Sequence, residues 1–122
     1  MYKISVETKF AAAHRLLGYQ GNCERIHGHN WIVKAQIAST ELDPIGMAYD
    51  FKELGQHVNS IIEKFDHQFL NEIHPFDKIN PSSENLANYI FQSLKDILPS
   101  NLKVIFVEIK ESDKYSAIYS ED

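Results

Sequence analysis

Hydrophobic and polar side chains alternate almost without interruption over residues 2–14. Apolar side chains such as Ile4 and Val6 lie on one parity, with lysine, serine and glutamate between them. Side chains two apart in an extended chain point to the same face, so this period predicts one long strand with one buried face. The strand is expected to end at His14, after three alanines. Residues 30–40 repeat the same alternation and predict a second strand.

Turn-forming residues separate these two predicted strands. Gly18, Gly21 and Asn22 favour a loop that returns the chain. We therefore expect an antiparallel hairpin that brings His14 to the same end as the segment Cys23-Glu24-Arg25-Ile26-His27-Gly28-His29. That segment contains one thiol, one carboxylate and two imidazoles.

The two histidines of this segment indicate a metal site. His27 and His29 are two residues apart, so their imidazoles converge on one face if the chain is extended. Two neutral imidazoles suit zinc, and His14 is the candidate for a third ligand from the neighbouring strand. Cys23 leaves two alternatives open, because a fourth ligand would close a structural site, whereas a free thiol beside an open position would serve catalysis. A His-Gly-His tripeptide alone is also typical of solvated loops.

Two amphipathic segments predict helices after the hairpin. Apolar residues recur at helical spacing from Phe51 to Phe65, and Asp50 is placed to cap this helix. A second helix is expected to begin at Ser82 or Ser83 and to end before Pro99.

The last part of the chain predicts two more strands. Residues 102–109 are apolar on both parities, which predicts a sheet covered on each face, and residues 115–119 form the fourth strand. The resulting order, β-β-α-α-β-β, is that of an α+β domain with an antiparallel four-stranded sheet and two helices on one face. Apolar residues on the remaining face favour packing against another copy of the chain.

Length, composition and charge exclude several classes of protein. The 122 residues fit a single domain, residues 1–122, and 43% hydrophobic content is typical of a folded globular protein. A net charge of −5 argues against nucleic acid or an anionic membrane as the main partner. One cysteine cannot form an intramolecular disulfide, and the amino terminus lacks the apolar core of a signal peptide. We therefore expect a cytoplasmic protein, without a transmembrane segment.

Two further positions could carry chemistry. Asp66-His67 directly follows the first predicted helix. A histidine there is often favoured by the helix dipole alone, but a carboxylate neighbour could also hold it in one tautomer for proton transfer. A thiolate at Cys23, near a histidine and a cation, could be its partner. Glu111 follows the third strand, where most glutamates are solvated, although a buried one could accept the paired N–H donors of a guanidine-like edge.

Together these residues resemble the 6-pyruvoyltetrahydropterin synthase family, and most closely its bacterial branch, the 6-carboxytetrahydropterin synthases of queuosine biosynthesis. The resemblance covers essentially the whole chain. It implies a tunnelling fold (T-fold), in which the sheets of three subunits join around a barrel and two trimers stack into a homohexamer with active sites at subunit interfaces. The motifs that carry it, in family order, are His14, Cys23-x3-His27-Gly28-His29, Asp50-Phe51, Asp66-His67, Asn80-Pro81-Ser82-Ser83-Glu84 and Lys110-Glu111.

The resemblance also implies an activity on a pterin. The expected reaction is a zinc-dependent carbon–carbon lyase step that converts 7,8-dihydroneopterin triphosphate to 6-carboxy-5,6,7,8-tetrahydropterin, acetaldehyde and triphosphate. Zinc, held by His14, His27 and His29, would polarise the side-chain oxygens of the substrate. Cys23 would abstract the proton, and Asp66-His67 would complete the relay.

Other residues acquire expected roles in substrate binding from the same resemblance. Glu111 would anchor the amino-pyrimidine edge of the pterin, and Ser82 or Ser83 could add hydrogen bonds to it. The triphosphate must meet cations, for which the candidates are Lys9, Arg15 and Arg25.

Departures from the family pattern leave the product open. Ser82 and Ser112 stand where threonine is common, and the hydroxyl is retained. Glu24 beside Cys23 also matches related folate-pathway enzymes, which resemble Glu-x-x-His-Gly-His and release 6-hydroxymethyl-dihydropterin. Neighbouring residues of an extended segment face opposite ways, so Cys23 and Glu24 should not both reach the substrate. Of the two, we favour Cys23 as the base. A non-catalytic, zinc-stabilised binding module is the third alternative, but it leaves Asp66-His67 and Glu111 without a role.

Overall fold

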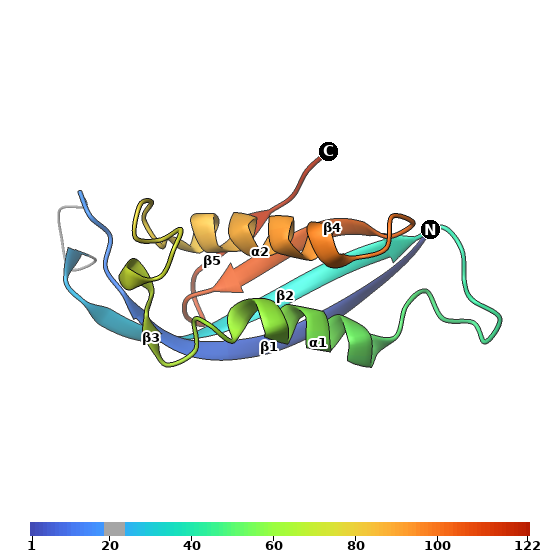
Figure 1. Ribbon diagram of the computed structural model, residues 1–122, viewed down its shortest axis with the longest axis horizontal. Coiled ribbons are helices and arrows are strands. Elements are labelled where there is room, and N and C mark those ends of the chain that lie inside the picture. The colour runs from blue at the N-terminus through green and yellow to red at the C-terminus, as the bar shows by residue number, and fades with distance from the viewer. Residues whose placement is uncertain (19–23) are drawn as a thin grey trace.

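Two long strands form the centre of the sheet in this computed structural model, which describes residues 1–18 and 24–122. Strand β1 (Tyr2–His14) pairs antiparallel with β2 (His27–Ser39) along its whole length, and His14 lies opposite His27. Figure 1 shows the two strands as long arrows that curve together beneath the helices. The hairpin predicted from the alternating sequence is confirmed.

Three shorter strands extend this hairpin. Strand β4 (Lys103–Lys110) pairs antiparallel with β2, and β5 (Ser116–Tyr119) pairs antiparallel with β4. On the other side, β3 (Gln68–Phe69) runs parallel to β1, so the order is β3-β1-β2-β4-β5. The expectation of four antiparallel strands was therefore incomplete, because a two-residue strand is too short to produce a period-2 pattern.

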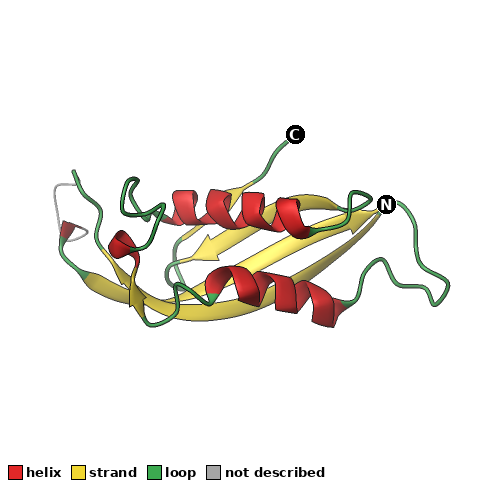
Figure 2. Ribbon diagram, in the orientation of Figure 1, coloured by secondary structure: helices red, strands yellow, loops and turns green. Residues whose placement is uncertain are grey.

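The two predicted helices lie side by side on one face of the sheet (Figure 2). Helix α1 (Phe51–Ile62) begins after Asp50, whose carboxylate accepts a hydrogen bond from the backbone N–H of Lys52 at 2.8 Å. It ends three residues earlier than predicted. Phe65 is buried, but it belongs to the turn beyond the helix. Phe51, counted in the predicted apolar stripe, is 65% exposed.

The second helix, α2 (Ser83–Ile97), is capped by Ser82, whose hydroxyl accepts a hydrogen bond from the Asn85 backbone N–H at 3.1 Å. A short 3₁₀ helix, η2 (Leu70–Glu72), lies between β3 and α2. No helix among the described residues combines the length and the apolar character needed to cross a lipid bilayer.

The core lies between the helices and the face of the sheet that they cover. Trp31 is fully buried at its centre, and its ring stacks on Phe10 with centroids 6.0 Å apart. Burial of apolar surface of this extent is the main stabilising contribution to such a fold. The side chains around this pair include Val33, Ala35, Leu54, Val58, Leu86, Ile90, Leu94 and Val107.

The other face of the sheet is not covered by helices of this chain, and its covering by another copy of the chain stays a prediction, although β4 is apolar on both parities in the sequence. A β-bulge explains the pattern: Gln36 pairs with Phe106 and Ile37 with Val104, so Ile105 is an extra residue. The inserted residue shifts the alternation by one position. Val104, an even-numbered residue, is therefore buried on the same side of the sheet as later, odd-numbered residues of β4.

Candidate metal centre

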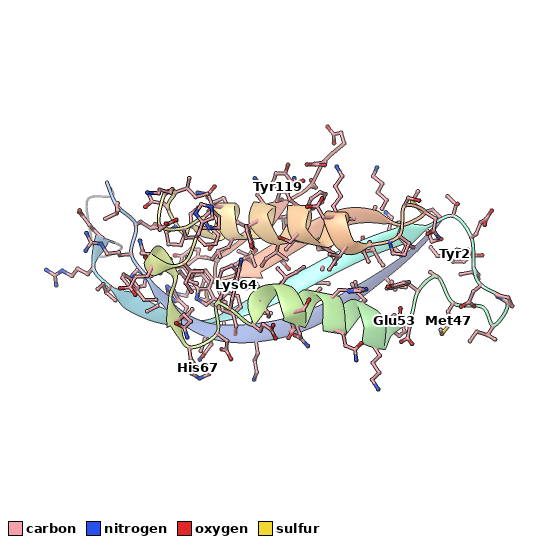
Figure 3. All side chains as sticks on the ribbon, viewed as in Figure 1. Tyr2, Met47, Glu53, Lys64, His67 and Tyr119 are labelled. Atoms are coloured by element: carbon pink, nitrogen blue, oxygen red, sulfur yellow. The ribbon has the colours of Figure 1, made fainter. Side chains whose placement is uncertain are left out.

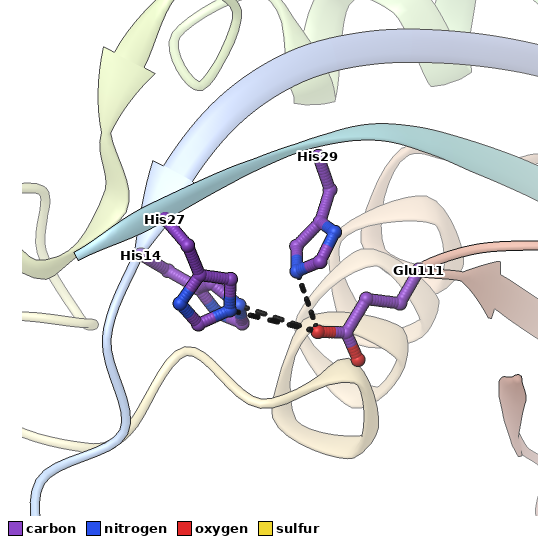
Figure 4. Close-up of side chains that lie close together, drawn as sticks. All are labelled: His14, His27, His29 and Glu111. Atoms are coloured by element: carbon purple, nitrogen blue, oxygen red, sulfur yellow. Dashed lines mark ion pairs between the residues drawn. The ribbon is translucent and has the colours of Figure 1, made fainter. Parts of the chain in front are cut away.

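Three imidazoles meet where β1 ends and β2 begins. His14 is the last residue of β1 and pairs with His27, the first residue of β2, while His29 follows on the same face. The ring centroids are 4.5 Å apart for His14 and His27, 4.8 Å for His27 and His29, and 5.2 Å for His14 and His29. Figure 4 shows the three rings turned toward one another. The antiparallel register therefore produces the convergence that the sequence indicated.

Backbone carbonyls orient two of these rings. The Nδ1 of His14 lies 2.8 Å from the Pro81 carbonyl oxygen, and the Nδ1 of His27 lies 2.7 Å from that of Arg25. A carbonyl oxygen can only accept, so each Nδ1 carries the hydrogen and each neutral ring presents the Nε2 lone pair to the centre. Metal-ligating histidines usually donate their other ring N–H to a protein acceptor in this way.

The residues present fit a divalent cation such as zinc. The Nε2 atoms of His14 and His29 are buried without a hydrogen-bond partner in the part of the chain that the structure describes. Buried polar atoms are almost always satisfied, so two such atoms aimed at one point indicate a missing partner. One ligand atom from each histidine and from Glu111 lies within 4.8 Å of all the others, and nitrogen and carboxylate oxygen are zinc ligands.

Burial favours the protonation state that such a centre needs. Desolvation lowers the pKa of His14, against the raising effect of its Pro81 hydrogen bond. Desolvation also lowers the pKa of His29, although the negative charge of Glu111 acts in the opposite direction. Both imidazoles are therefore held neutral, the form that donates a lone pair to a metal.

Trp31 supports the histidines from the core side. Its indole Nε1 donates a hydrogen bond to the Ala12 carbonyl oxygen at 3.2 Å. The ring stands nearly perpendicular to those of His14 and His29, with centroids 4.8 and 5.1 Å away. The two imidazoles therefore pack against the buried indole ring, which limits their movement.

Glu111 lies closer to the imidazoles than the sequence suggested. Its Oε1 is 2.7 Å from the Nε2 of His29, and its Oε2 is 3.4 Å from the Ser83 hydroxyl. Sequence reasoning placed this carboxylate at the substrate and not among the histidines. Its position follows from the pairing of Lys110 with Ile32, and the sequence carries no signal for this register.

The Asp66-His67 pair lies elsewhere, at the outer edge of β1. The Asp66 carboxylate accepts a hydrogen bond from the Ala11 N–H at 2.9 Å, and this bond lowers the pKa of Asp66. Its Oδ1 is 3.1 Å from the His67 Nδ1. The His67 side chain is 81% exposed and points away from the sheet in Figure 3. Within one chain, this pair therefore does not join the three imidazoles.

The remaining candidates are spread around the centre. Cys23 lies outside the described residues, and its neighbour Glu24 is exposed. The Ser82 hydroxyl is engaged in the cap of α2. Of the expected phosphate-binding cations, Lys9 and Arg25 are exposed and Arg15 is half-buried.

Comparison with known proteins identifies the family. A sequence profile described as 6-pyruvoyl tetrahydropterin synthase matches residues 3–122. The chain belongs to this family. The solved 6-pyruvoyl tetrahydropterin synthase of Caenorhabditis elegans superposes with a TM-score of 0.85 at 30% identity, covering 99% of this chain and 96% of that one. The subunit fold expected from the resemblance, that of a T-fold protein, is thereby confirmed, while the assembly stays a prediction.

Other members of the 6-pyruvoyl tetrahydropterin synthase family carry a more specific name. A 6-carboxy-5,6,7,8-tetrahydropterin synthase of Synechocystis is 34% identical over 101 residues, which cover 79% of this chain and 77% of that protein. A protein of Archaeoglobus fulgidus with the same name, assigned provisionally, is 37% identical over 116 residues, covering 94% and 93%.

Proposed function

We propose that this protein is a zinc-dependent carbon–carbon lyase that converts 7,8-dihydroneopterin triphosphate to 6-carboxy-5,6,7,8-tetrahydropterin, acetaldehyde and triphosphate, in queuosine biosynthesis. The observation that carries the proposal is the convergence of three buried or half-buried imidazoles whose Nε2 atoms face one point. Relatives named as 6-carboxy-5,6,7,8-tetrahydropterin synthases support the choice of product.

In this proposal His14, His27 and His29 hold the zinc ion. When bound, the ion supplies a Lewis acid that polarises the side-chain oxygens of the substrate. The carbonyls of Pro81 and Arg25 keep both neighbouring rings in the tautomer that leaves Nε2 free, and Trp31 keeps the rings in place. The protein thus contributes a prearranged set of three nitrogen ligands.

Proton transfer is assigned to Cys23, with Asp66 and His67 as the relay. The Oδ1 of Asp66 lies 3.1 Å from Nδ1 of His67, which leaves the exposed Nε2 to take or return a proton. Because this pair lies at the edge of β1, away from the imidazoles of its own chain, we propose that it serves the centre of a neighbouring copy. Glu24 is the alternative base of the folate-pathway reaction.

An assembly of several subunits would complete such a site. Among the described residues, the outer edge of β1 pairs with a strand only at Ala12 and Ala13, and the backbone of Ala11 is bonded to Asp66 and His67, so residues 2–10 offer backbone groups to another strand. We propose the homohexamer of two stacked trimers. Light scattering after gel filtration should give six times the 14.1 kDa of one chain, and a monomer would contradict the shared active site.

Mass spectrometry of the products from 7,8-dihydroneopterin triphosphate tests the reaction. We expect 6-carboxytetrahydropterin and acetaldehyde from zinc-loaded protein, no product after chelation, and recovery when zinc is restored. Release of 6-hydroxymethyl-dihydropterin would instead assign the folate-pathway reaction. Absence of any pterin product from the zinc-loaded protein would favour the non-catalytic binding module.

The variants Cys23→Ala and Glu24→Gln identify the base. We expect Cys23→Ala to lose turnover but keep its zinc, and Glu24→Gln to retain both. Loss of zinc from the Cys23→Ala protein would make the thiol a ligand and contradict its role as base.

A further inference from the structure

One oxygen of Glu111 approaches all three imidazoles of the centre. Oε1 lies 2.7 Å from the Nε2 of His29, 3.4 Å from that of His14 and 3.9 Å from that of His27 (Figure 4). Ligands around a tetrahedral zinc ion at about 2.0–2.1 Å are roughly 3.3 Å from one another. The three distances from Oε1 to the imidazole nitrogens are scattered around this ligand–ligand separation. Oε1 therefore lies where a fourth ligand of the metal would lie.

Hydrogen bonds alone do not account for this arrangement. The Nδ1 atoms of His14 and His27 donate to carbonyl oxygens, so their neutral rings present lone pairs to the carboxylate. The buried Nε2 of His29, although close to Oε1, has no partner in hydrogen-bond geometry among the described residues. The Nε2 lone pairs of neutral His14 and His27 face this carboxylate oxygen at 3.4 and 3.9 Å and repel it, and a cation between them reverses the sign of the interaction.

Glu111 is held less firmly than His14. His14 is fully buried and tied to Pro81, whereas the Glu111 side chain is 28% exposed. In the described part of the chain, its second oxygen has only the contact of 3.4 Å with the Ser83 hydroxyl. Its backbone is fixed, because the Glu111 N–H donates to the Tyr115 carbonyl oxygen at 3.1 Å where the chain turns from β4 to β5. The carboxylate can therefore swing while its backbone stays in place.

We propose that Glu111 is a fourth, exchangeable metal ligand that leaves the centre when it binds the amino-pyrimidine edge of a pterin. The inference rests on the proposed function and deepens it. The paired N–H donors of the pterin edge engage both oxygens of a carboxylate, so Glu111 cannot bind that edge and keep an oxygen on the metal. Recognition of the pterin therefore frees a coordination position for the substrate. The exchange breaks one carboxylate–metal bond and transfers no electron. Without a pterin, the carboxylate keeps that position closed.

Cobalt replacement tests the first half of the proposal without relying on turnover. The visible absorption of Co²⁺ reports the number and kind of its ligands. We expect Glu111→Gln to change this spectrum and to weaken Co²⁺ binding, measured by chelator competition, by about 10-fold or more. Glu108→Gln is the matched control, since Glu108 lies on β4, shortly before Glu111, and its carboxylate accepts a hydrogen bond from the Ser116 hydroxyl at 3.1 Å. It should leave both readings unchanged.

Unsubstituted pterin, which has the amino-pyrimidine edge but no side-chain oxygen to offer the metal, tests the second half. Its binding, followed by fluorescence, should shift the Co²⁺ spectrum of the unmodified protein toward that of Glu111→Gln. Binding without a spectral shift would overturn the exchange. Equal spectra and affinities for the unmodified and Glu111→Gln proteins would overturn the ligand role while leaving the proposed lyase intact. Failure of the unmodified protein to bind Co²⁺ would refute the metal centre itself.

Discussion

The Nδ1 of His14 lies 2.8 Å from the carbonyl oxygen of Pro81, although 67 residues separate the two in the sequence. This hydrogen bond joins the end of β1 to the segment that leads into α2. His14 is fully buried, so the bond both orients the imidazole and satisfies a carbonyl in the interior. The candidate metal centre and the packing of α2 are therefore coupled through one side chain.

Replacing His14 should destabilise the fold as well as the centre. In metal-free protein, His14→Ala leaves a cavity and an unpaired carbonyl, and we expect the free energy of unfolding in urea to fall by about 2 kcal/mol. His27→Ala, at a half-exposed ring, should cost clearly less, while both variants lose metal. A larger loss for His27→Ala would contradict the structural role of the His14–Pro81 bond.

Trp31 should be among the least replaceable core residues. Trp31→Ala removes a fully buried ring and the hydrogen bond to Ala12, and we expect about 3–5 kcal/mol of destabilisation in chemical denaturation. Phe51→Ala is the aromatic control, because this ring is 65% exposed, and its effect should stay within about 0.5 kcal/mol. Similar losses for the two variants would contradict the assigned core.

His67 should matter for turnover and not for stability. We expect His67→Ala to lower kcat by about 10²–10⁴-fold, as for loss of a proton-transfer group, with the melting temperature and the zinc content unchanged. His74→Ala is the matched control, because His74 is also exposed and its Nδ1 lies 3.0 Å from a carboxylate oxygen of Asp77. Equal turnover of the two variants would remove His67 from the mechanism.

Glu121 should give the stability a characteristic dependence on pH. Hydrogen bonds from Tyr119, Gln92 and Lys95 lower the pKa of Glu121 from 4.5 to about 2. A lowered pKa stabilises the fold above the ordinary value, and the contribution is lost as the pH falls from 4.5 through about 2. Glu121→Gln should therefore be less stable than the unmodified protein at pH 7, and the difference should shrink below pH 4.5. A difference independent of pH would refute this network.

Two asparagine side chains should hold the chain where β1 leaves the sheet. Asn80 accepts a hydrogen bond from the Leu17 N–H and donates one to the Leu17 carbonyl, both at 2.9 Å. Asn71 binds Arg15 in the same way. We expect Asn80→Ala to accelerate hydrogen exchange at the Leu17 amide while the Arg15 amide keeps its protection. Unchanged exchange at Leu17 would show that this contact does not order the segment.

Local patterns made much of this protein predictable. Strict alternation from Tyr2 to His14 specified a strand, the turn formers after it specified a hairpin, and the His-x-His spacing placed two imidazoles on one face. Asp50 and Ser82 marked the helix starts because their side chains cap the first free backbone N–H groups. Each of these signals acts over a few residues, which is why the sequence alone carries it.

Other features depend on contacts between distant segments and had no local signal. The bulge at Ile105, which makes β4 look apolar on both parities, exists only through its pairing with β2. The approach of Glu111 to His29 follows from the same register, and the bond from His14 to Pro81 needs α2 in place. The sequence by itself determined the four longer strands, the two helices and the three histidines proposed as ligands. Only the tertiary structure decided which carboxylate faces those histidines and that Asp66-His67 lies apart from them, because register and packing are properties of the whole chain.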